Sequence, residues 1–97
     1  MTGKQKRYND RLFNIRYALP EKIRQRVTRE RIEILFDSLN RRQQTALVLR
    51  YGLAGGKSHT YREVAEILGN TPQAAERLIK RAKSRLYLLS KEKLLDN

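Results

Sequence analysis

Four polar side chains in the last third of the chain have a spacing suited to contacting DNA bases. They follow one another at i, i+3, i+4 and i+7, which places all four on one ridge of a helix. The four residues are Gln73, Glu76, Arg77 and Lys80. Glutamine pairs bidentately with adenine and arginine with guanine in the major groove, each contributing about 1–3 kcal/mol of discrimination. We therefore predict that Gln73 and Arg77 contact bases, while Glu76 must accept from a cytosine amino group or repel phosphate.

Further polar residues flank this ridge and suit contacts to phosphate. Arg81, Lys83 and Arg85 follow it along the same segment. Thr71 stands just before the ridge and Arg62 lies on the preceding segment, and we include both in the expected DNA-binding set. The alternative is that these side chains only form a solvated helix surface.

Two helices joined by a short turn are expected to position the ridge. Thr60 and Glu63 form a capping box, which predicts a helix that starts directly after Thr60. Gly69 is expected to end that helix, because glycine adopts the left-handed conformation without strain. Thr71 with Pro72 then marks the start of a second helix. This layout predicts a helix-turn-helix.

Apolar spacing and caps predict the remaining helices, so we expect an all-α fold. One helix is expected over Glu21–Leu39 and another over Arg41–Tyr51, the second capped by Asn40 with Gln43 and ended by Gly52. The buried line of the last helix is expected to comprise Ala75, Leu78, Ala82, Leu86 and Leu89.

The expected domain covers residues 20–97, preceded by a basic tail over residues 1–19. Lys4, Lys6 and Arg7 give the tail its charge, and a short helix before Pro20 is an open alternative. Leu94 and Leu95 at the other end either fold back on the core, dock a partner or stay unfolded.

Charge and composition favour a nucleic-acid partner. The 97 residues include 22 Lys and Arg against 10 Asp and Glu, a formal net charge of +12. No apolar run approaches a membrane span and no signal-peptide pattern opens the chain, so we expect a cytoplasmic protein. The chain has no cysteine and one histidine, and it shows no nucleophile, base and orienter set. We therefore expect no metal, no cofactor, no small-molecule substrate and no catalysis.

One glycine-rich segment approaches a phosphate-binding loop without matching it. Gly52, Gly56, Lys57 and Ser58 nearly fit G-x-x-x-x-G-K-[ST], but only three residues separate the two glycines. The segment also follows a helix, whereas such a loop follows a strand. We interpret it as a flexible connector.

The residues at the helix junctions resemble region 4 of bacterial sigma factors. The resemblance spans about residues 27–88 and is clearest in Leu49–Leu53 (Leu-Arg-Tyr-Gly-Leu) and His59–Val64 (His-Thr-Tyr-Arg-Glu-Val). It implies a domain that binds the upstream, −35-type promoter element and grips the β flap of RNA polymerase. Thr71-Pro72-Gln73-Ala74 departs from the Thr-Arg-Glu-Arg usual there, and Arg77 stands where glutamine is common, so we expect a different promoter sequence.

The resemblance leaves three functions to weigh. The leading one is a sigma-like initiation factor that binds promoter DNA and polymerase, with a second sigma-like subunit as a further partner because only region 4 is expected here. Apolar positions on the earlier helices, Leu35, Phe36, Leu47 and Leu49, are candidates for a polymerase groove or for plain core. The alternatives are a polymerase-binding protein that no longer reads DNA sequence, and a simple DNA-binding regulator.

Overall fold

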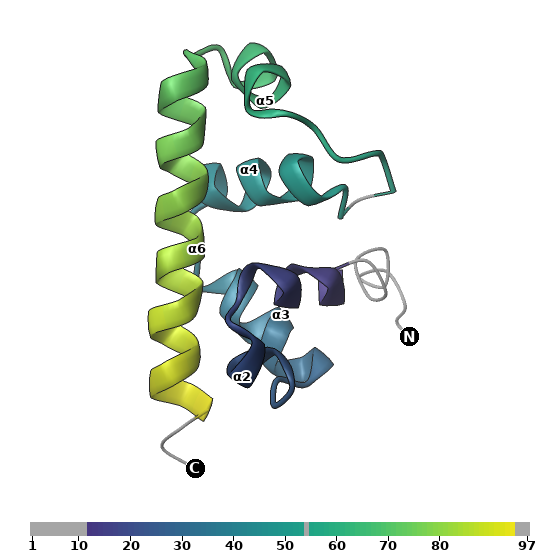
Figure 1. Cartoon of the computed structure of the whole chain (residues 1–97), viewed down its shortest axis with the longest axis vertical. Helices are drawn as coiled ribbons and strands as arrows, with labels where there is room; N and C mark the ends of the chain where they lie inside the picture. Colours follow the sequence, from purple (N-terminus) through teal and green to yellow (C-terminus); the bar gives the residue numbers. More distant parts are fainter. Residues whose placement is uncertain (1–11, 54, 95–97) are drawn as a thin grey trace.

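The structure, a computed structural model, describes residues 12–53 and 55–94 (Figure 1). Its elements in chain order are the 3₁₀ helix η2 (Phe13–Ala18), α2 (Glu21–Arg24), α3 (Arg29–Asp37), α4 (Arg41–Tyr51), α5 (Tyr61–Leu68) and α6 (Pro72–Leu94). No strand occurs among the described residues, and the all-α prediction is confirmed. The basic residues Lys4, Lys6 and Arg7, and Leu95 at the other end, lie outside the described part.

The long helix α6 is the element against which the other helices pack. Figure 1 shows α5 beside its N-terminal end, α4 further along, and α2 and α3 beside its C-terminal part. Among these, α5 and α4 make the most extensive contacts with α6, and α3 makes fewer. The two ends of α6 therefore have different neighbours, and only its N-terminal half belongs to the helix-turn-helix.

The buried side of α6 differs in part from the prediction. Its fully buried residues are Ala75, Ile79, Ala82, Leu86 and Ser90. Successive members are three or four residues apart, which keeps them on one stripe of the helix. Leu78 and Leu89 lie at the edge of this stripe and are half-buried. The buried Ser90 hydroxyl is satisfied, because its Oγ donates to the Tyr87 carbonyl at 2.7 Å.

Two capping boxes start α4 and α5 where the sequence predicts them. Asn40 Oδ1 accepts from the Gln43 amide at 2.8 Å, and Gln43 Oε1 accepts from the Asn40 amide at 3.1 Å. The same exchange joins Thr60 and Glu63, with distances of 3.1 and 2.9 Å. The hydrogen bond from the Thr60 amide lowers the pKa of the Glu63 carboxyl. These reciprocal bonds satisfy amide donors that the first turn of a helix leaves without partners.

The prediction of one helix over Glu21–Leu39 is wrong. Helix α2 ends at Arg24, and α3 begins only after Thr28, whose backbone is extended. Thr28 Oγ1 accepts from the Arg31 amide at 3.2 Å and so caps α3. Between the two helices Val27 turns inward and is buried. The local competition of a threonine cap with helix continuation explains the break.

The segment before Pro20 contributes to the core. Leu12, Ile15 and Leu19 are buried in the same apolar cluster as the side chains of α3 and α4. On the outside of η2, the Arg16 guanidinium lies 4.0 Å from the ring centroid of Phe13 and 4.4 Å from that of Tyr17. The domain bounds expected from the sequence, residues 20–97, stay a prediction, and these three core side chains precede residue 20.

Two glycines end helices where the sequence predicts, and both have the left-handed conformation that was predicted for Gly69. Gly52 has a φ of 63° and Gly69 a φ of 75°. A Cβ on Gly52 would lie 2.7 Å from the Gly56 carbonyl oxygen, whereas a Cβ on Gly69 would meet no heavy atom within 4 Å. At Gly69 the requirement for glycine is therefore purely one of backbone conformation.

Replacement of Gly69 should destabilise the domain through its backbone alone. We expect Gly69→Ala to lower the free energy of unfolding by about 1–2 kcal/mol, the cost of a left-handed non-glycine residue. Gly69→Val should cost more, because a β-branched side chain is a genuine outlier there. Thermal melts should show a shift of about 4–8 °C per kcal/mol.

Gly56→Ala is the matched control. The backbone of Gly56 is not left-handed, and a Cβ added there would meet no heavy atom within 4 Å. Equal melting temperatures for Gly69→Ala and Gly56→Ala would contradict the assignment of the turn.

Candidate nucleic-acid interface

The turn between α5 and α6 sets the direction of the predicted ridge. Val64 and Ala65 of α5 are buried, and the Gly69 amide donates to the Ala65 carbonyl at 2.8 Å to close the helix. Thr71 Oγ1 then accepts from the Ala74 amide at 3.1 Å, and Pro72 is the first residue of α6. The helix end, the turn and the helix start all lie where the sequence predicts them.

The predicted ridge points to solvent at the N-terminal half of α6. Gln73, Arg77 and Lys80 are exposed and Glu76 is partly exposed. Lys80 Nζ lies 3.0 Å from Glu76 Oε2, so this carboxylate already has a cation as partner. The hydrogen bond to Glu76 raises the pKa of Lys80. The ion pair with Lys80 neutralises the only negative charge of the ridge, so Arg77 adds a net positive charge to it.

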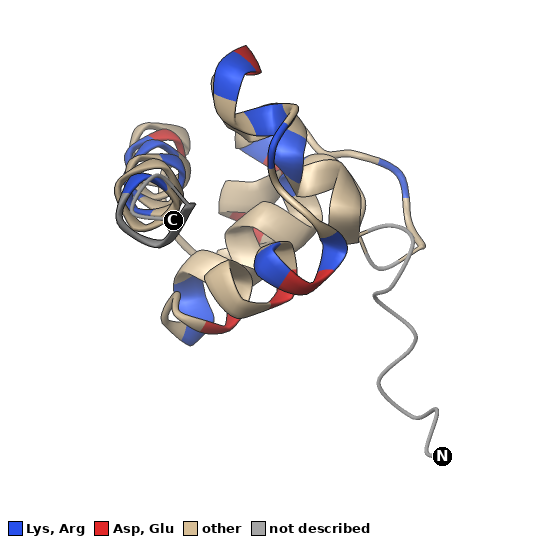
Figure 2. Ribbon diagram, turned by 90° about the horizontal axis from the view of Figure 1, so that it is seen from below, with Lys and Arg blue, Asp and Glu red and all other residues tan. Residues whose placement is uncertain are grey.

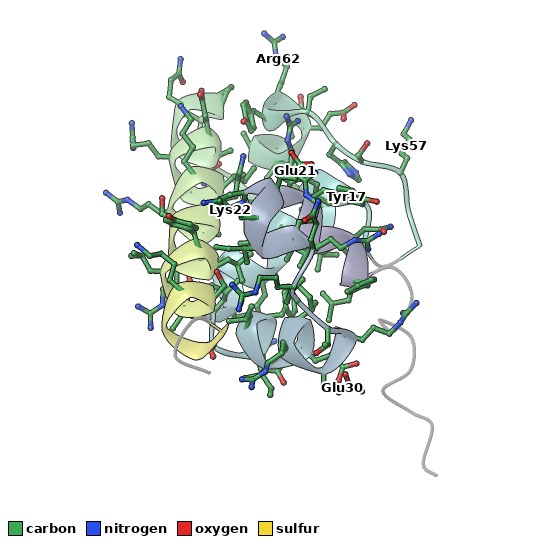
Figure 3. The ribbon with its side chains drawn as sticks, turned by 60° about the horizontal axis from the view of Figure 1, so that its bottom comes forward. Tyr17, Glu21, Lys22, Glu30, Lys57 and Arg62 are labelled. Atoms are coloured by element: carbon green, nitrogen blue, oxygen red, sulfur yellow. The ribbon has the colours of Figure 1, made fainter. Side chains whose placement is uncertain are left out.

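The flanking residues of the predicted set are also accessible. Thr71, Arg81 and Arg85 are exposed along α6 and at its start, and Arg62 is exposed on α5. Figure 3 shows Arg62 projecting away from the α5 end of the molecule. In Figure 2, which looks along α6 from its C-terminal end, the charged residues of this helix are mostly Lys or Arg. The surface formed by the predicted DNA-binding residues is therefore open and basic.

A residue that the sequence analysis missed joins this surface from α4. Arg42 lines a small pocket together with Arg77 and Arg81 of α6, and Asn70, Ala74 and Leu78 complete its wall. Three arginines that line one hollow would favour an anion with several oxygens, such as a phosphate. The only sequence signal for Arg42 is its place in the first turn of a capped helix, thirty-five residues before Arg77. Its approach to α6 is a consequence of tertiary packing.

The turn residue of this pocket carries an unsatisfied polar atom. Asn70 Oδ1 is buried and has no hydrogen-bond partner among the described residues. An unpaired buried carbonyl group costs free energy in the isolated domain. The phosphate oxygens favoured by the three arginines are acceptors and would not satisfy it, so Asn70 is not added to the expected contacts.

The side chains predicted for a polymerase groove are mostly inside the core. Leu35, Phe36 and Leu47 have exposed fractions of 1%, 4% and 0%. Helix η2 packs on α3 and α4, and its apolar side chains share one cluster with these three residues. Leu49 is half-buried and lines a shallow hollow on α4, with Phe36 at its edge. A groove with all four side chains accessible is thus absent from the described surface.

The connector between α4 and α5 is anchored at its α5 end. The His59 amide donates to the Leu49 carbonyl at 3.0 Å, and the His59 ring Nδ1 lies 2.9 Å from the same oxygen. Arg50 Nη1 donates to the His59 carbonyl at 2.9 Å, and its guanidinium lies 4.2 Å from the Tyr61 ring centroid. These contacts fix the start of α5 relative to the end of α4.

Neither a metal site nor a membrane-spanning helix is found among the described residues. Over residues 12–53 and 55–94, no group of three His, Cys, Asp or Glu side chains is placed to hold a metal ion. Of the helices in this part of the chain, none is both long and apolar enough to cross a membrane.

The fold and this basic surface define a helix-turn-helix domain of the DNA-binding class. The family model described as sigma-70, region 4, matches residues 35–87, which is more than half of the chain. The chain therefore belongs to the sigma-70 region 4 family, whose members are DNA-binding regulatory domains and not enzymes. No significant match was found among curated proteins or solved structures. The match includes the whole helix-turn-helix, whereas η2 and α2 precede it.

Removal of the Glu76 carboxylate should strengthen DNA binding without altering the fold. In Glu76→Gln the Lys80 ammonium loses its partner and becomes available to phosphate. A plot of log affinity against log salt should then steepen by about 0.9, the value for one additional phosphate contact. The melting temperature should hardly change, because exposed ion pairs contribute little to stability.

Glu30→Gln makes the same change of charge on α3, and Figure 3 shows Glu30 at the opposite end of the molecule from Arg62. If both variants steepen the salt dependence equally, net charge alone governs binding and the ion pair on α6 has no part in it.

Proposed function

We propose that this protein directs transcription by RNA polymerase, binding upstream promoter DNA through the N-terminal half of α6. The observation that carries the proposal is the shared pocket of Arg42, Arg77 and Arg81 beside the exposed ridge. A helix of about 10–12 Å diameter fits a major groove about 12 Å wide. A helix-turn-helix places the N-terminal residues of its second helix against base edges.

Within this proposal the two kinds of contact are divided between residues. Gln73 and Arg77 are exposed on the ridge and contact base edges, where their side chains give sequence discrimination. Arg42, Arg62 and Arg81 contact phosphates on either side, which fixes the register of the helix without reading sequence. Arg77 belongs to both groups, since it is part of the ridge and also lines the arginine pocket.

Polymerase binding is the second part of the proposal and is supported by the family alone. Part of the apolar surface of α4 remains accessible in the hollow lined by Val48 and Leu49 together with Arg41, Gln44 and Thr45. We assign the β flap of the polymerase to this hollow, because an apolar side chain of a partner helix would bury Leu49 there. Leu35 and Leu47 act as core beneath it.

The deciding experiment compares Arg77→Ala with the wild type in DNA and polymerase binding. The preferred duplex is first selected from random sequences, and binding to it and to a scrambled duplex is measured by band shift. We expect Arg77→Ala to weaken the preferred duplex by about 1–3 kcal/mol and to relax specificity at one base position. Capture of core polymerase on beads should persist, and transcription from the selected promoter should fall.

Arg31→Ala removes the same charge from α3 and should leave both kinds of binding near the wild type. If Arg77→Ala leaves DNA affinity and transcription unchanged while polymerase is still captured, the chain acts on polymerase without reading DNA. If neither protein captures polymerase but DNA binding is specific, the chain is a simple DNA-binding regulator.

A further inference from the structure

A second basic surface lies at the opposite end of α6 from the arginine pocket. Lys22 of α2, Arg26 just after it and Lys91 of α6 are all exposed and surround one pocket. Figure 3 shows Lys22 on the side of α2 nearest α6. Residues 20–26 and Lys91 fall outside the stretch matched by the sigma-70 region 4 model. The pocket is therefore built largely by parts of this chain that the family model does not include.

The floor of this pocket is apolar. It is lined by Pro20, Ile23 and Tyr87, of which Ile23 is buried and Tyr87 is half-buried. The Lys91 ammonium lies 5.3 Å from the Tyr87 ring centroid and so stands over the floor. The floor would accept one apolar side chain, and the cations around it would bind carboxylates next to that side chain.

The charge of the lining is of one sign. None of the six residues that line the pocket is acidic, although Glu21 is adjacent to Lys22 in sequence. The cations thus have no carboxylate partner within the lining. Three like charges around an apolar floor complement a ligand that is both acidic and partly apolar.

Duplex DNA fits this pocket less well than an acidic peptide does. The pocket is about 20 Å along α6 from Arg77, since fourteen residues separate Arg77 from Lys91 at about 1.5 Å each. The DNA backbone supplies negative charge but no apolar group to cover Ile23 and Tyr87. A peptide with acidic residues around one aromatic side chain supplies both.

We propose that the pocket between α2 and the C-terminal part of α6 binds an acidic segment of a partner protein that inserts one apolar side chain. The inserted side chain packs on Ile23 and Tyr87, and its neighbouring carboxylates pair with Lys22, Arg26 and Lys91. Exposed ion pairs are individually weak and are screened by salt, so the complex is salt-sensitive and transient. This proposal does not depend on sequence-specific DNA binding by the N-terminal half of α6.

The test uses the full chain and a fluorescein-labelled peptide of twelve residues, Asp and Glu with one central phenylalanine. Fluorescence anisotropy gives its affinity for the wild type, for K22E/R26E and for K57E/R31E. Both double variants change the net charge equally, but Lys57 and Arg31 lie outside the pocket. Circular dichroism confirms that each variant is folded.

We expect K22E/R26E to weaken the peptide by about tenfold or more, because two attractive contacts become repulsive, and K57E/R31E to weaken it much less. A peptide with glutamine in place of phenylalanine should bind several-fold more weakly to the wild type. Wild-type amide shifts in ¹⁵N spectra should centre on Ile23 and Tyr87.

Three results would overturn the proposal. The first is no binding of the peptide to the wild type, and the second is equal loss in the two double variants, which would make net charge the sole cause. The third concerns DNA. If K22E/R26E lowers the affinity for a duplex more than K57E/R31E does, while neither double variant changes the affinity for the peptide, the surface belongs to the DNA interface.

Discussion

The structure depends on the packing of α5 against the N-terminal half of α6 across the turn at Gly69. Small and branched side chains are buried where the two helices form the core. They are Val64 and Ala65 on α5 and Ala75 and Ile79 on α6. Small side chains let the two backbones approach closely, and the left-handed Gly69 lets the chain change direction within the three residues 69–71. Once this packing is fixed, the opposite side of α6 must face solvent.

The charge of the chain follows from the same constraint. The buried stripe of α6 consists mainly of alanine, isoleucine and leucine side chains, so the cations of this helix lie on its outer side. Between Pro72 and Arg85 that side carries Arg77, Lys80, Arg81, Lys83 and Arg85 against the single carboxylate of Glu76. Concentrated positive charge on one rigid helix favours a polyanion through release of its counterions. Helix α4 adds Arg42 to this charge only because it packs against α6.

The division of α6 into two ends gives this small domain two separate surfaces. The N-terminal half is held by α5 and belongs to the part shared with the sigma-70 region 4 family. The C-terminal part is joined by α2, and its pocket combines an apolar floor with cations. The burial of Leu12, Ile15 and Leu19 ties η2 into the same core, so the residues before the family match support the second surface.

Whether a feature can be predicted from the sequence depends on how far apart along the chain the residues that determine it lie. The capping boxes at Asn40 and Thr60, and the turn at Gly69, are set by residues three or four positions apart, and all three are confirmed. The exposure of the ridge at Arg77 follows from helix periodicity. The break at Thr28 also has a local cause, the threonine cap of α3, which the prediction of one helix over Glu21–Leu39 did not take into account.

Features that depend on tertiary packing could not be predicted in this way. The meeting of Arg42 with Arg77 and the covering of Leu35 and Leu47 require knowledge of which helices touch. The same holds for Ile79, which the predicted buried line of α6 did not include and which packing buries. Sequence periodicity gives the stripe of a helix, but its neighbours decide which edge of that stripe is covered.

The most direct test of the account is to map the DNA contact surface on the whole protein by ¹⁵N NMR. The amide spectrum is recorded while a short duplex selected for binding is added at low salt. The account predicts that the largest shifts fall on Arg42, Arg62 and residues 71–85, with residues 12–27 nearly unchanged. Shifts centred on α2 and α3, or spread evenly over all exposed amides, would contradict the claim that the N-terminal half of α6 is the DNA-binding surface.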